Sequence, residues 1–297
     1  MIIEDKLILG TVQFGLNYGI NNFRGKPKDN EITKILDYAF SKGVNFLDTA
    51  DAYGNASRLI GFYHNQQNNI FKINTKFILN NFSIQEQIES SINQLSVNSI
   101  ETYFFHNYND FINQPNSLND LLKLKENGKI KKIGISIYEN SELLTSINTQ
   151  EIDVIQIPFN LLDNKSKRGD LINLAKEKGK IIQVRSVFLQ GLFFLEKEQV
   201  PPKLKQLIPY LIQLKQIAIE YNISIEHLAL NYVLYQDFID YILIGVDTKE
   251  QLIKNLSFIK MKIPECAYEK IDKINVIIDH ILYPKNFDLG RSHLRSL

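Results

Sequence analysis

The sequence predicts an α/β protein that folds as a single (β/α)8 barrel, and three observations carry this prediction. Eight short runs rich in Ile, Val, Phe and Tyr are each too brief for a helix and suit parallel strands buried on both faces. Polar segments with helical spacing separate most of them. Four successive runs end at Asp48, Lys76, His106 and Ser136, at intervals of 28, 30 and 30 residues, about one barrel unit each. Strict alternation leaves an open doubly wound sheet as the competing fold, and the count of eight favours the barrel.

The strand candidates occupy residues 7–10, 44–48, 71–76, 100–106, 133–136, 154–157, 181–184 and 241–244. An open nucleotide-binding sheet normally carries a GxGxxG turn after its first strand. Residues 10–15, with the sequence GTVQFG, do not supply that turn. The missing motif is a further argument for the closed barrel.

Capping residues predict where helices begin and end between these strands. Residues 84–95 carry apolar side chains at steps of four, four and three, which places them on one helix face. Ser83 and Glu86 form a capping-box pattern at the start of this segment, and Thr248 with Gln251 repeats the pattern after the eighth strand. Glycines at positions 43, 128 and 179 stand just before strand candidates, where a left-handed residue ends a helix.

One interval is longer than the barrel period and predicts a helical insertion after the seventh strand. From Val184 to Tyr241 the chain advances 57 residues. Residues 189–203 are expected to form a loop, followed by helices near 203–221 and 224–236. After the eighth strand we expect one helix, a further helix from 264 to about 280, and a tail. No linker divides the chain, so residues 1–297 are expected to form one domain.

Composition and charge restrict the function. The net charge is +1 and no long basic block is present, so nothing indicates a nucleic-acid partner. The first residues are acidic, unlike a secretory signal, and no apolar stretch approaches the ~20 residues that span a bilayer. The single cysteine, Cys266, cannot form an internal disulfide, and no Cys/His cluster has metal-ligand spacing. We therefore expect a cytoplasmic protein that acts on a small molecule, without a metal or a membrane contact, as a monomer or small homo-oligomer.

Polar residues at the strand ends are the candidates for catalysis, because the carboxyl ends of parallel barrel strands meet at one mouth. Asp48, Lys76 and His106 end the second, third and fourth strand candidates, and Tyr53 follows Asp48 in its loop. A lysine paired with a carboxylate can lower the pKa of a nearby tyrosine and make it a better proton donor. A histidine across the pocket can orient a carbonyl oxygen. The four residue types fit one mechanism, in which Tyr53 protonates a reacting oxygen.

The same residues lie in motifs that resemble those of the aldo-keto reductase family. Residues 46–54, with the sequence FLDTADAYG, look like the signature of that family. Further motifs in the family's order are residues 9–11 with 14–15, residues 75–76 and residues 105–106. The likeness continues through 134–136, Gln156, 159–160, Ser186, 191–192, 244–245 and Asn255, so it covers nearly the whole chain.

The resemblance implies an enzyme, an NAD(P)H-dependent oxidoreductase that reduces an aldehyde, ketone or sugar carbonyl by hydride transfer. Tyr53 would be the general acid, Lys76 and Asp48 would tune its proton, and His106 would position the carbonyl. NADPH is the family's usual cofactor, and NAD is the other possibility. The cofactor site would comprise Gly10, Thr11, Asp48, Ser136, Gln156, Arg185, Ser186, Gly245, Thr248, Gln251 and Asn255. Of these, Ser136 and Gln156 would hold the nicotinamide carboxamide, and free amides of a helix that begins near Thr248 would attract phosphate.

Three positions depart from the pattern of many relatives. Ile137 stands where an asparagine contacts the nicotinamide amide, and Arg185 stands where an aromatic ring lies against the nicotinamide. A guanidinium is planar and can also stack. Gln251 stands where a basic residue often holds the adenosine 2′-phosphate, although Lys249 and Lys254 are near. The choice between NADPH and NADH therefore stays open.

Two other functions are compatible with these motifs. One is a non-catalytic NADP-binding subunit that senses redox state for a partner protein, which the changes at Ile137 and Arg185 favour. The other is a sugar-modifying enzyme that uses the cofactor transiently, without net consumption. The expected substrate is a sugar or nucleotide-sugar, because polar residues occupy the variable loops and the tail, namely Asn17, Tyr18, Asn107, Tyr108, Arg291 and Arg295.

Overall fold

Eight parallel strands close into a barrel in the order β1 to β8, in a computed structural model that describes residues 3–114, 116–277, 279–283 and 287. The strands are β1 (Leu7–Gly10), β2 (Phe46–Asp48), β3 (Lys72–Phe77), β4 (Ile100–Phe105), β5 (Ile130–Ser136), β6 (Val154–Pro158), β7 (Ile181–Arg185) and β8 (Tyr241–Gly245). Each overlaps the run predicted for it, and β1 pairs with both β2 and β8. The (β/α)8 barrel is confirmed.

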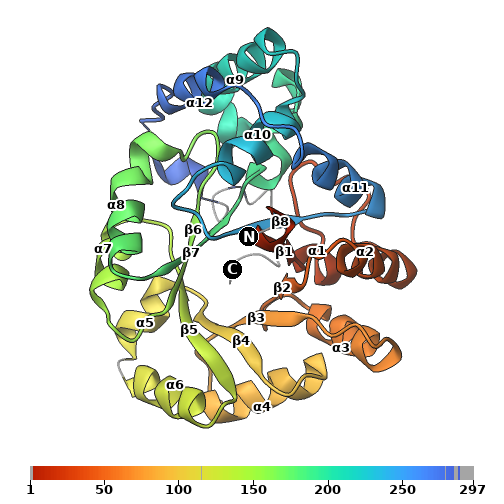
Figure 1. Ribbon diagram of the computed structural model, residues 1–297, viewed down its shortest axis with the longest axis vertical. Helices are drawn as coiled ribbons and strands as arrows, with labels where there is room; N and C mark the ends of the chain where they lie inside the picture. Colours follow the sequence, from red (N-terminus) through yellow and green to blue (C-terminus); the bar gives the residue numbers. More distant parts are fainter. Residues whose placement is uncertain (1–2, 115, 278, 284–286, 288–297) are drawn as a thin grey trace.

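The helices lie outside the ring of strands (Figure 1). They are α1 (Val12–Gly15), α2 (Asp29–Ser41), α3 (Ala56–Gln66), α4 (Ile84–Leu95), α5 (Tyr108–Asn113), α6 (Asn116–Glu126), α7 (Asn140–Asn148), α8 (Lys165–Glu177), α9 (Ile208–Glu220), α10 (Ile225–Leu234), α11 (Lys249–Phe258) and α12 (Glu265–Asp272). Short 3-10 helices are η1 (Ile3–Lys6), η2 (Leu189–Phe194), η3 (Lys197–Gln199), η4 (Pro202–Leu207) and η5 (Asp279–Leu282).

The predicted capping residues of α4 and α11 and the three predicted glycines do mark helix ends. The Ser83 hydroxyl accepts from the Glu86 amide at 3.2 Å, and the Glu86 carboxylate accepts from the Ser83 amide at 2.8 Å, which completes the capping box of α4. Thr248 caps α11 by accepting from the Gln251 amide at 3.3 Å. The three predicted glycines take positive φ values of 72° to 82° where α2, α6 and α8 end.

The insertion after β7 is confirmed, with two differences in detail. The segment predicted as a loop contains the 3-10 helices η2 and η3, and η4, α9 and α10 follow. The helix predicted to reach residue 280 ends at Asp272, because the side-chain amide of Asn164 binds the carbonyls of Ile271 and Ile274, each at 2.9 Å. In Figure 1, α12 lies beside α9 of the insertion, and the two helices are in contact.

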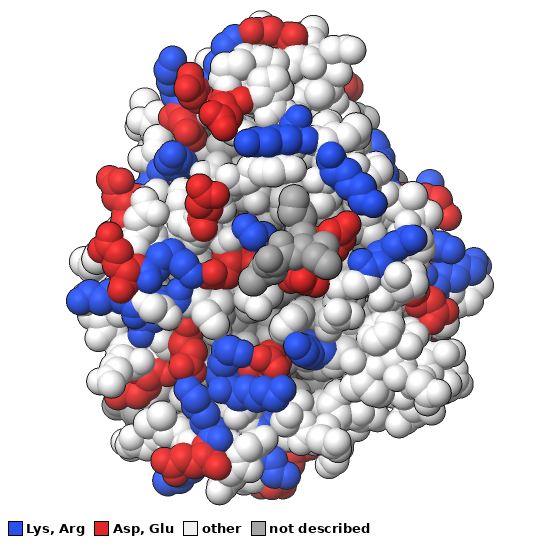
Figure 2. Space-filling view, in the orientation of Figure 1, with Lys and Arg blue, Asp and Glu red and all other residues white. Residues whose placement is uncertain are grey.

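Burial on both faces explains why the strands read as continuous apolar runs. All five residues of β6 are buried, and the rings of Phe77, Tyr103 and Phe105 pack at centroid distances of 4.9 and 5.0 Å between β3 and β4. No helix of the described residues is long and apolar enough to cross a membrane. Acidic and basic side chains are mixed over the face shown in Figure 2, in keeping with a net charge of +1.

Candidate active site

The four predicted catalytic residues meet at the carboxyl ends of neighbouring strands. Asp48 ends β2, Lys76 lies one residue before the end of β3, and His106 directly follows β4. Tyr53 comes from the loop between β2 and α3. The Lys76 ammonium lies over the Tyr53 ring, 5.4 Å from its centroid, and the Tyr53 ring stands edge-on to His106 at 6.2 Å. These residues are far apart in the sequence, and the parallel order of the strands brings them together at one mouth of the barrel.

Asp48 and Lys76 form a buried ion pair, and each is only 2% exposed. The Lys76 ammonium also donates to the Thr49 carbonyl at 3.1 Å, and the Gln156 side-chain amide donates to the second Asp48 oxygen at 2.9 Å. Burial lowers the pKa of Lys76, and the Asp48 carboxylate opposes that shift. The pair is therefore fixed in place and leaves almost no net charge.

The proton of Tyr53 is held more firmly than the sequence predicts. Burial and the Asp48 carboxylate raise the pKa of the Tyr53 hydroxyl well above its ordinary value, because both disfavour the phenolate. Lys76 was expected to lower this pKa; in the structure burial and the Asp48 carboxylate outweigh that effect, and Asp48 pairs with the ammonium that lies over the tyrosine ring. Tyr53 is protonated at neutral pH and can act as a proton donor.

His106 is a neutral imidazole. Burial, together with the positive charges of Lys76 and Arg185, lowers the pKa of His106 to about 3. A neutral imidazole carries one N–H that can be donated to a carbonyl oxygen. His106 can thus orient a substrate without exchanging a proton near neutral pH.

The residues expected around a nicotinamide are buried and polar, and they fit that group. Ser136 of β5 lies opposite Gln156 of β6 in the strand register. The Gln156 side-chain oxygen is buried and has no hydrogen-bond partner among the described residues. A buried acceptor without a partner costs free energy unless a ligand donates to it. The N–H group of a carboxamide is a donor of the kind required.

Gly10, Thr11 and Gly245 line the seam between β1 and β8. Gly10 and Gly245 are register partners, and a Cβ at Gly245 would come within 2.3 Å of the Gln13 side chain. The Thr11 hydroxyl is fully buried and donates to the Asp48 carbonyl at 2.9 Å. Thr11 therefore positions Asp48, while its proposed contact with a cofactor stays a prediction.

Arg185, the last residue of β7, adds a positive charge to this mouth. After burial, that charge helps to lower the pKa values of Lys76 and His106, and it partly opposes the rise in the pKa of Tyr53. Its guanidinium lies over the ring of Tyr138, 4.2 Å from the centroid, and donates to the Ile137 carbonyl at 3.1 Å. The Ile137 side chain is buried in the core. Two of the three departures from the family pattern are thus in direct contact, through the Arg185 guanidinium and the Ile137 backbone carbonyl.

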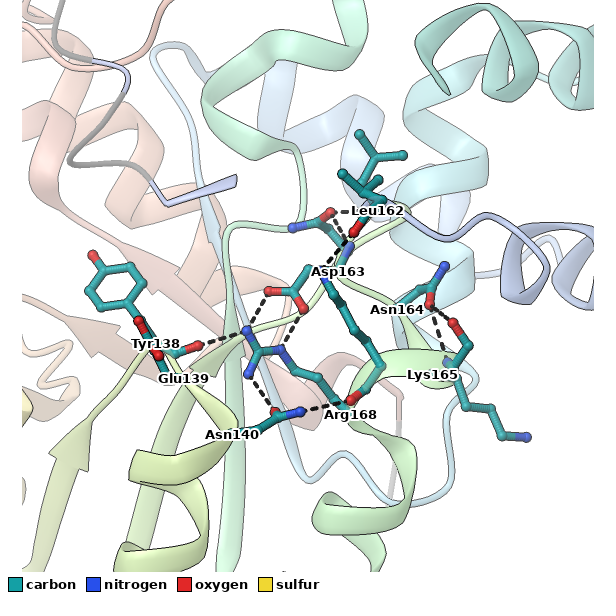
Figure 3. A network of polar contacts seen from close by, with 12 residues as sticks. Tyr138, Glu139, Asn140, Leu162, Asp163, Asn164, Lys165 and Arg168 are labelled. Atoms are coloured by element: carbon teal, nitrogen blue, oxygen red, sulfur yellow. Dashed lines mark hydrogen bonds and ion pairs between the residues drawn. The ribbon is translucent and has the colours of Figure 1, made fainter. Parts of the chain in front are cut away.

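A buried ion pair fixes the backbone of Tyr138 (Figure 3). Arg168 of α8 donates to both oxygens of Asp163, at 2.5 and 2.7 Å. The same guanidinium donates to the Tyr138 carbonyl at 2.7 Å and to the Asn140 side chain of α7 at 3.1 Å. In Figure 3 the Tyr138 ring points away from this network. Helices α7 and α8 therefore hold the ring against which Arg185 rests.

The rim beyond β7 has a strained backbone. Ser186, Leu189 and Gln190 have positive φ values of 63°, 46° and 56°, in a region that favours glycine. The loop between α1 and α2 crosses to this rim, because the Ile20 amide donates to the Gln190 carbonyl at 3.0 Å. Strain of this kind gathers at ligand sites, and the cofactor role of Ser186 stays a prediction.

Two backbone amides at the start of α11, where the sequence predicts free amides, already have side-chain partners. The Lys249 amide donates to a carboxylate oxygen of Glu31 from α2 at 2.9 Å, and the Gln251 amide is taken by Thr248. The Gln251 side chain folds back to accept from the Asp247 amide at 2.7 Å. Protein side chains thus accept from the Lys249 and Gln251 amides, and phosphate binding at this helix start stays a prediction.

Several residues near the site were not found from the sequence, among them Tyr138 and Glu31. Tyr138 could have been found as the second residue beyond a strand end, whereas nothing local marks Glu31. Tyr18, expected only as a polar loop residue, lies within electrostatic reach of Tyr53 and Arg185. Arg291 and Arg295 lie outside the described residues. Within the described part of the chain, no three His, Cys, Asp or Glu side chains could together hold a metal ion.

Known proteins of one family resemble this chain over most of its length. The model described as the Aldo/keto reductase family matches residues 6–276. The chain is 24% identical over 275 residues to the NADH-specific methylglyoxal reductase of Escherichia coli (strain K12), which covers 79% of this chain and 84% of that protein. It is also 24% identical over 274 residues to the aldo-keto reductase str7 of Strobilurus tenacellus, over 83% of this chain and 81% of that one.

Solved structures share the fold. An aldo-keto reductase from Bacillus halodurans in its holo form superposes with a TM-score of 0.74 at 21% identity, covering 91% of this chain and 92% of that one. The glycerol dehydrogenase from Gluconobacter oxydans superposes with a TM-score of 0.72 at 20% identity, covering 91% and 90%.

Proposed function

The chain belongs to the aldo/keto reductase family, and we propose that it reduces the carbonyl group of a small molecule with a nicotinamide dinucleotide. The observation that carries the proposal is the buried cluster at the barrel mouth, where a protonated Tyr53 lies between the Lys76 ammonium and His106. Each group is in the protonation state that a carbonyl reduction needs. Tyr53 can give a proton, and His106 can donate a hydrogen bond.

In this proposal each of the four side chains has a distinct role in the reaction at the carbonyl oxygen. When bound, the reduced cofactor supplies a hydride to the carbonyl carbon. His106 donates its N–H to the oxygen and sets its direction. Tyr53 gives its proton to the same oxygen as negative charge develops there. Lys76, held by Asp48 and the Thr49 carbonyl, stabilises the phenolate that remains on Tyr53.

Ser136 and Gln156 hold the nicotinamide carboxamide in this proposal. The support is the buried Gln156 oxygen that lacks a partner among the described residues. The Gln156 side-chain amide is already committed to Asp48 at 2.9 Å, which orients the free oxygen. Asp48 therefore serves both the proton donor and the cofactor site.

We propose NADH rather than the family default NADPH as the preferred cofactor. Gln251 is uncharged, and the nearby lysines are engaged elsewhere, since the Lys249 ammonium lies 5.4 Å from the Tyr38 ring centroid and Lys254 pairs with Glu226 at 2.7 Å. The Glu31 carboxylate at the start of α11 would repel a 2′-phosphate. The printed name of the Escherichia coli relative, an NADH-specific enzyme, supports the same choice.

Calorimetric titration with NADH and NADPH, followed by a panel of carbonyl compounds, tests the proposal. The panel includes methylglyoxal, on the strength of the relative's name, and sugar aldehydes, on the strength of the polar loops. We expect net loss of nicotinamide absorbance with at least one compound, and a fall in kcat of at least ~100-fold in Tyr53→Phe. Cofactor binding without turnover of any compound would instead favour a redox-sensing subunit.

A further inference from the structure

Arg185 is a charged side chain with unused hydrogen-bond donors. A guanidinium has five N–H groups, and the one hydrogen bond that Arg185 makes in the described structure goes to the Ile137 carbonyl at 3.1 Å. The Tyr138 ring covers one face of the guanidinium at 4.2 Å. No Asp or Glu of the described residues lies within salt-bridge distance of Arg185, whereas the neighbouring Arg168 is fully paired with Asp163.

Among the described residues, no negative charge near Arg185 is free to balance it. The carboxylate of Asp48 is already neutralised by Lys76. The pKa of His106 is lowered to about 3, so the imidazole is neutral, and burial raises the pKa values of Tyr18 and Tyr53, so both stay protonated. A half-buried charge without a counter-ion is costly, and the cost is recovered when an anion binds.

Arg185 is also held in a fixed direction. The Arg168–Asp163 pair fixes the Tyr138 backbone (Figure 3). The Tyr138 ring in turn supports the guanidinium of Arg185. A guanidinium that is positioned in advance loses little freedom when it binds a carboxylate or phosphate through two parallel hydrogen bonds. The network that supports Tyr138 lies on α7 and α8, and none of its residues is predicted to contact the cofactor.

We propose that Arg185 binds an anionic group of the substrate. The substrate is then a carbonyl compound that also carries a carboxylate or a phosphate. This inference rests on the proposed function, because it places the anion beside the carbonyl that Tyr53 and His106 engage. A nicotinamide dinucleotide also carries phosphates, and the experiment separates that source of negative charge from the substrate.

Two pairs of carbonyl compounds test whether Arg185 recognises a negative charge on the substrate, because the two members of each pair differ in that charge. They are phenylglyoxylate with its methyl ester, and 4-carboxybenzaldehyde with its methyl ester. The ratio of kcat/KM between acid and ester is measured for the wild type, Arg185→Gln and Arg185→Lys. We expect Arg185→Gln to lower the ratio by roughly 10- to 100-fold for at least one pair, and Arg185→Lys to retain part of it.

Arg24→Gln is the matched control, because it removes the same charge from the exposed α1–α2 loop. Its acid-to-ester ratio is expected to stay within about twofold of the wild type, since an exposed charge is screened by solvent. Circular dichroism melts of each variant confirm that the barrel is folded.

Calorimetry with NADH, benzoate and benzamide separates the possible failures. Tighter binding of benzoate than of benzamide by wild type, lost in Arg185→Gln, supports the inference even if no carbonyl compound is turned over, which would count against the proposed function alone. An unchanged ratio together with weaker NADH binding in Arg185→Gln would overturn it and assign Arg185 to the cofactor phosphates. An unchanged ratio with unchanged NADH binding would overturn it as well.

Discussion

His106 couples the stability of the barrel to pH. Its pKa is lowered to about 3 in the folded protein by burial and by the charges of Lys76 and Arg185, against about 6.5 in an unfolded chain. The unfolded state therefore binds more protons between these two values. The contribution of neutral His106 to the free energy of unfolding is fully present above pH 6.5, and it is lost progressively as the pH falls towards 3.

The size of the effect follows from the two pKa values. At pH 5 the solution is about 1.5 pH units below the pKa of His106 in the unfolded chain. Each unit changes the free energy of unfolding by about 1.36 kcal/mol. His106 alone should thus remove about 2 kcal/mol of unfolding free energy between pH 7 and pH 5. Glutamine does not titrate, so His106→Gln should remove this loss of about 2 kcal/mol from the pH dependence of stability.

Urea unfolding followed by circular dichroism at pH 7 and pH 5 measures this component. The loss of stability on acidification should be about 2 kcal/mol smaller in His106→Gln than in wild type. Tyr53→Phe is the control, since it alters the ring that faces His106 without removing a group that titrates in this range. Equal losses in wild type and His106→Gln would refute a neutral, buried His106.

Three further changes have definite expected outcomes. Asp48→Asn leaves the Lys76 ammonium buried without its carboxylate, and the unfolding free energy should fall by about 3–5 kcal/mol in urea titrations; a loss under about 1 kcal/mol would mean that the pair is not buried. Glu31→Gln removes a carboxylate from the start of α11 and should improve NADPH binding relative to NADH by about fivefold in calorimetry, whereas no change would remove Glu31 from cofactor selection. Gly61→Ala puts a Cβ 1.9 Å from the Gln94 carbonyl, so α3 must move away from α4 and stability should fall by about 3 kcal/mol, and a wild-type melting temperature would contradict that close packing.

The barrel was predictable because the physical cause of each strand is local. Strands buried on both faces need apolar side chains throughout, as in β6, so they stand out as short continuous runs. The α4 cap depends on two residues three positions apart, Ser83 and Glu86. The early end of the helix at Asp272 was not predictable, since the Asn164 amide that binds the Ile271 carbonyl in its last turn is more than a hundred residues away.

The residue types of the site were predictable, and their electrostatics were not. Strand ends identify Asp48, Lys76 and His106, because parallel order alone brings such residues together. The direction of the Tyr53 pKa shift depends on how deeply the ring is buried and on where the Lys76 ammonium lies relative to it. The contact between Glu31 and the Lys249 amide joins residues 218 positions apart, and no local pattern announces it.

The central claim is that this barrel transfers a hydride to a carbonyl carbon and that Tyr53 supplies the proton. The most direct measurement uses NADH that carries deuterium at both C4 positions of the nicotinamide, and mass spectrometry of the alcohol formed from the best carbonyl compound of the panel. We predict one deuterium on the former carbonyl carbon, and a fall in its rate of appearance of at least ~100-fold in Tyr53→Phe. An alcohol without deuterium, or an equal rate in Tyr53→Phe, would contradict the account.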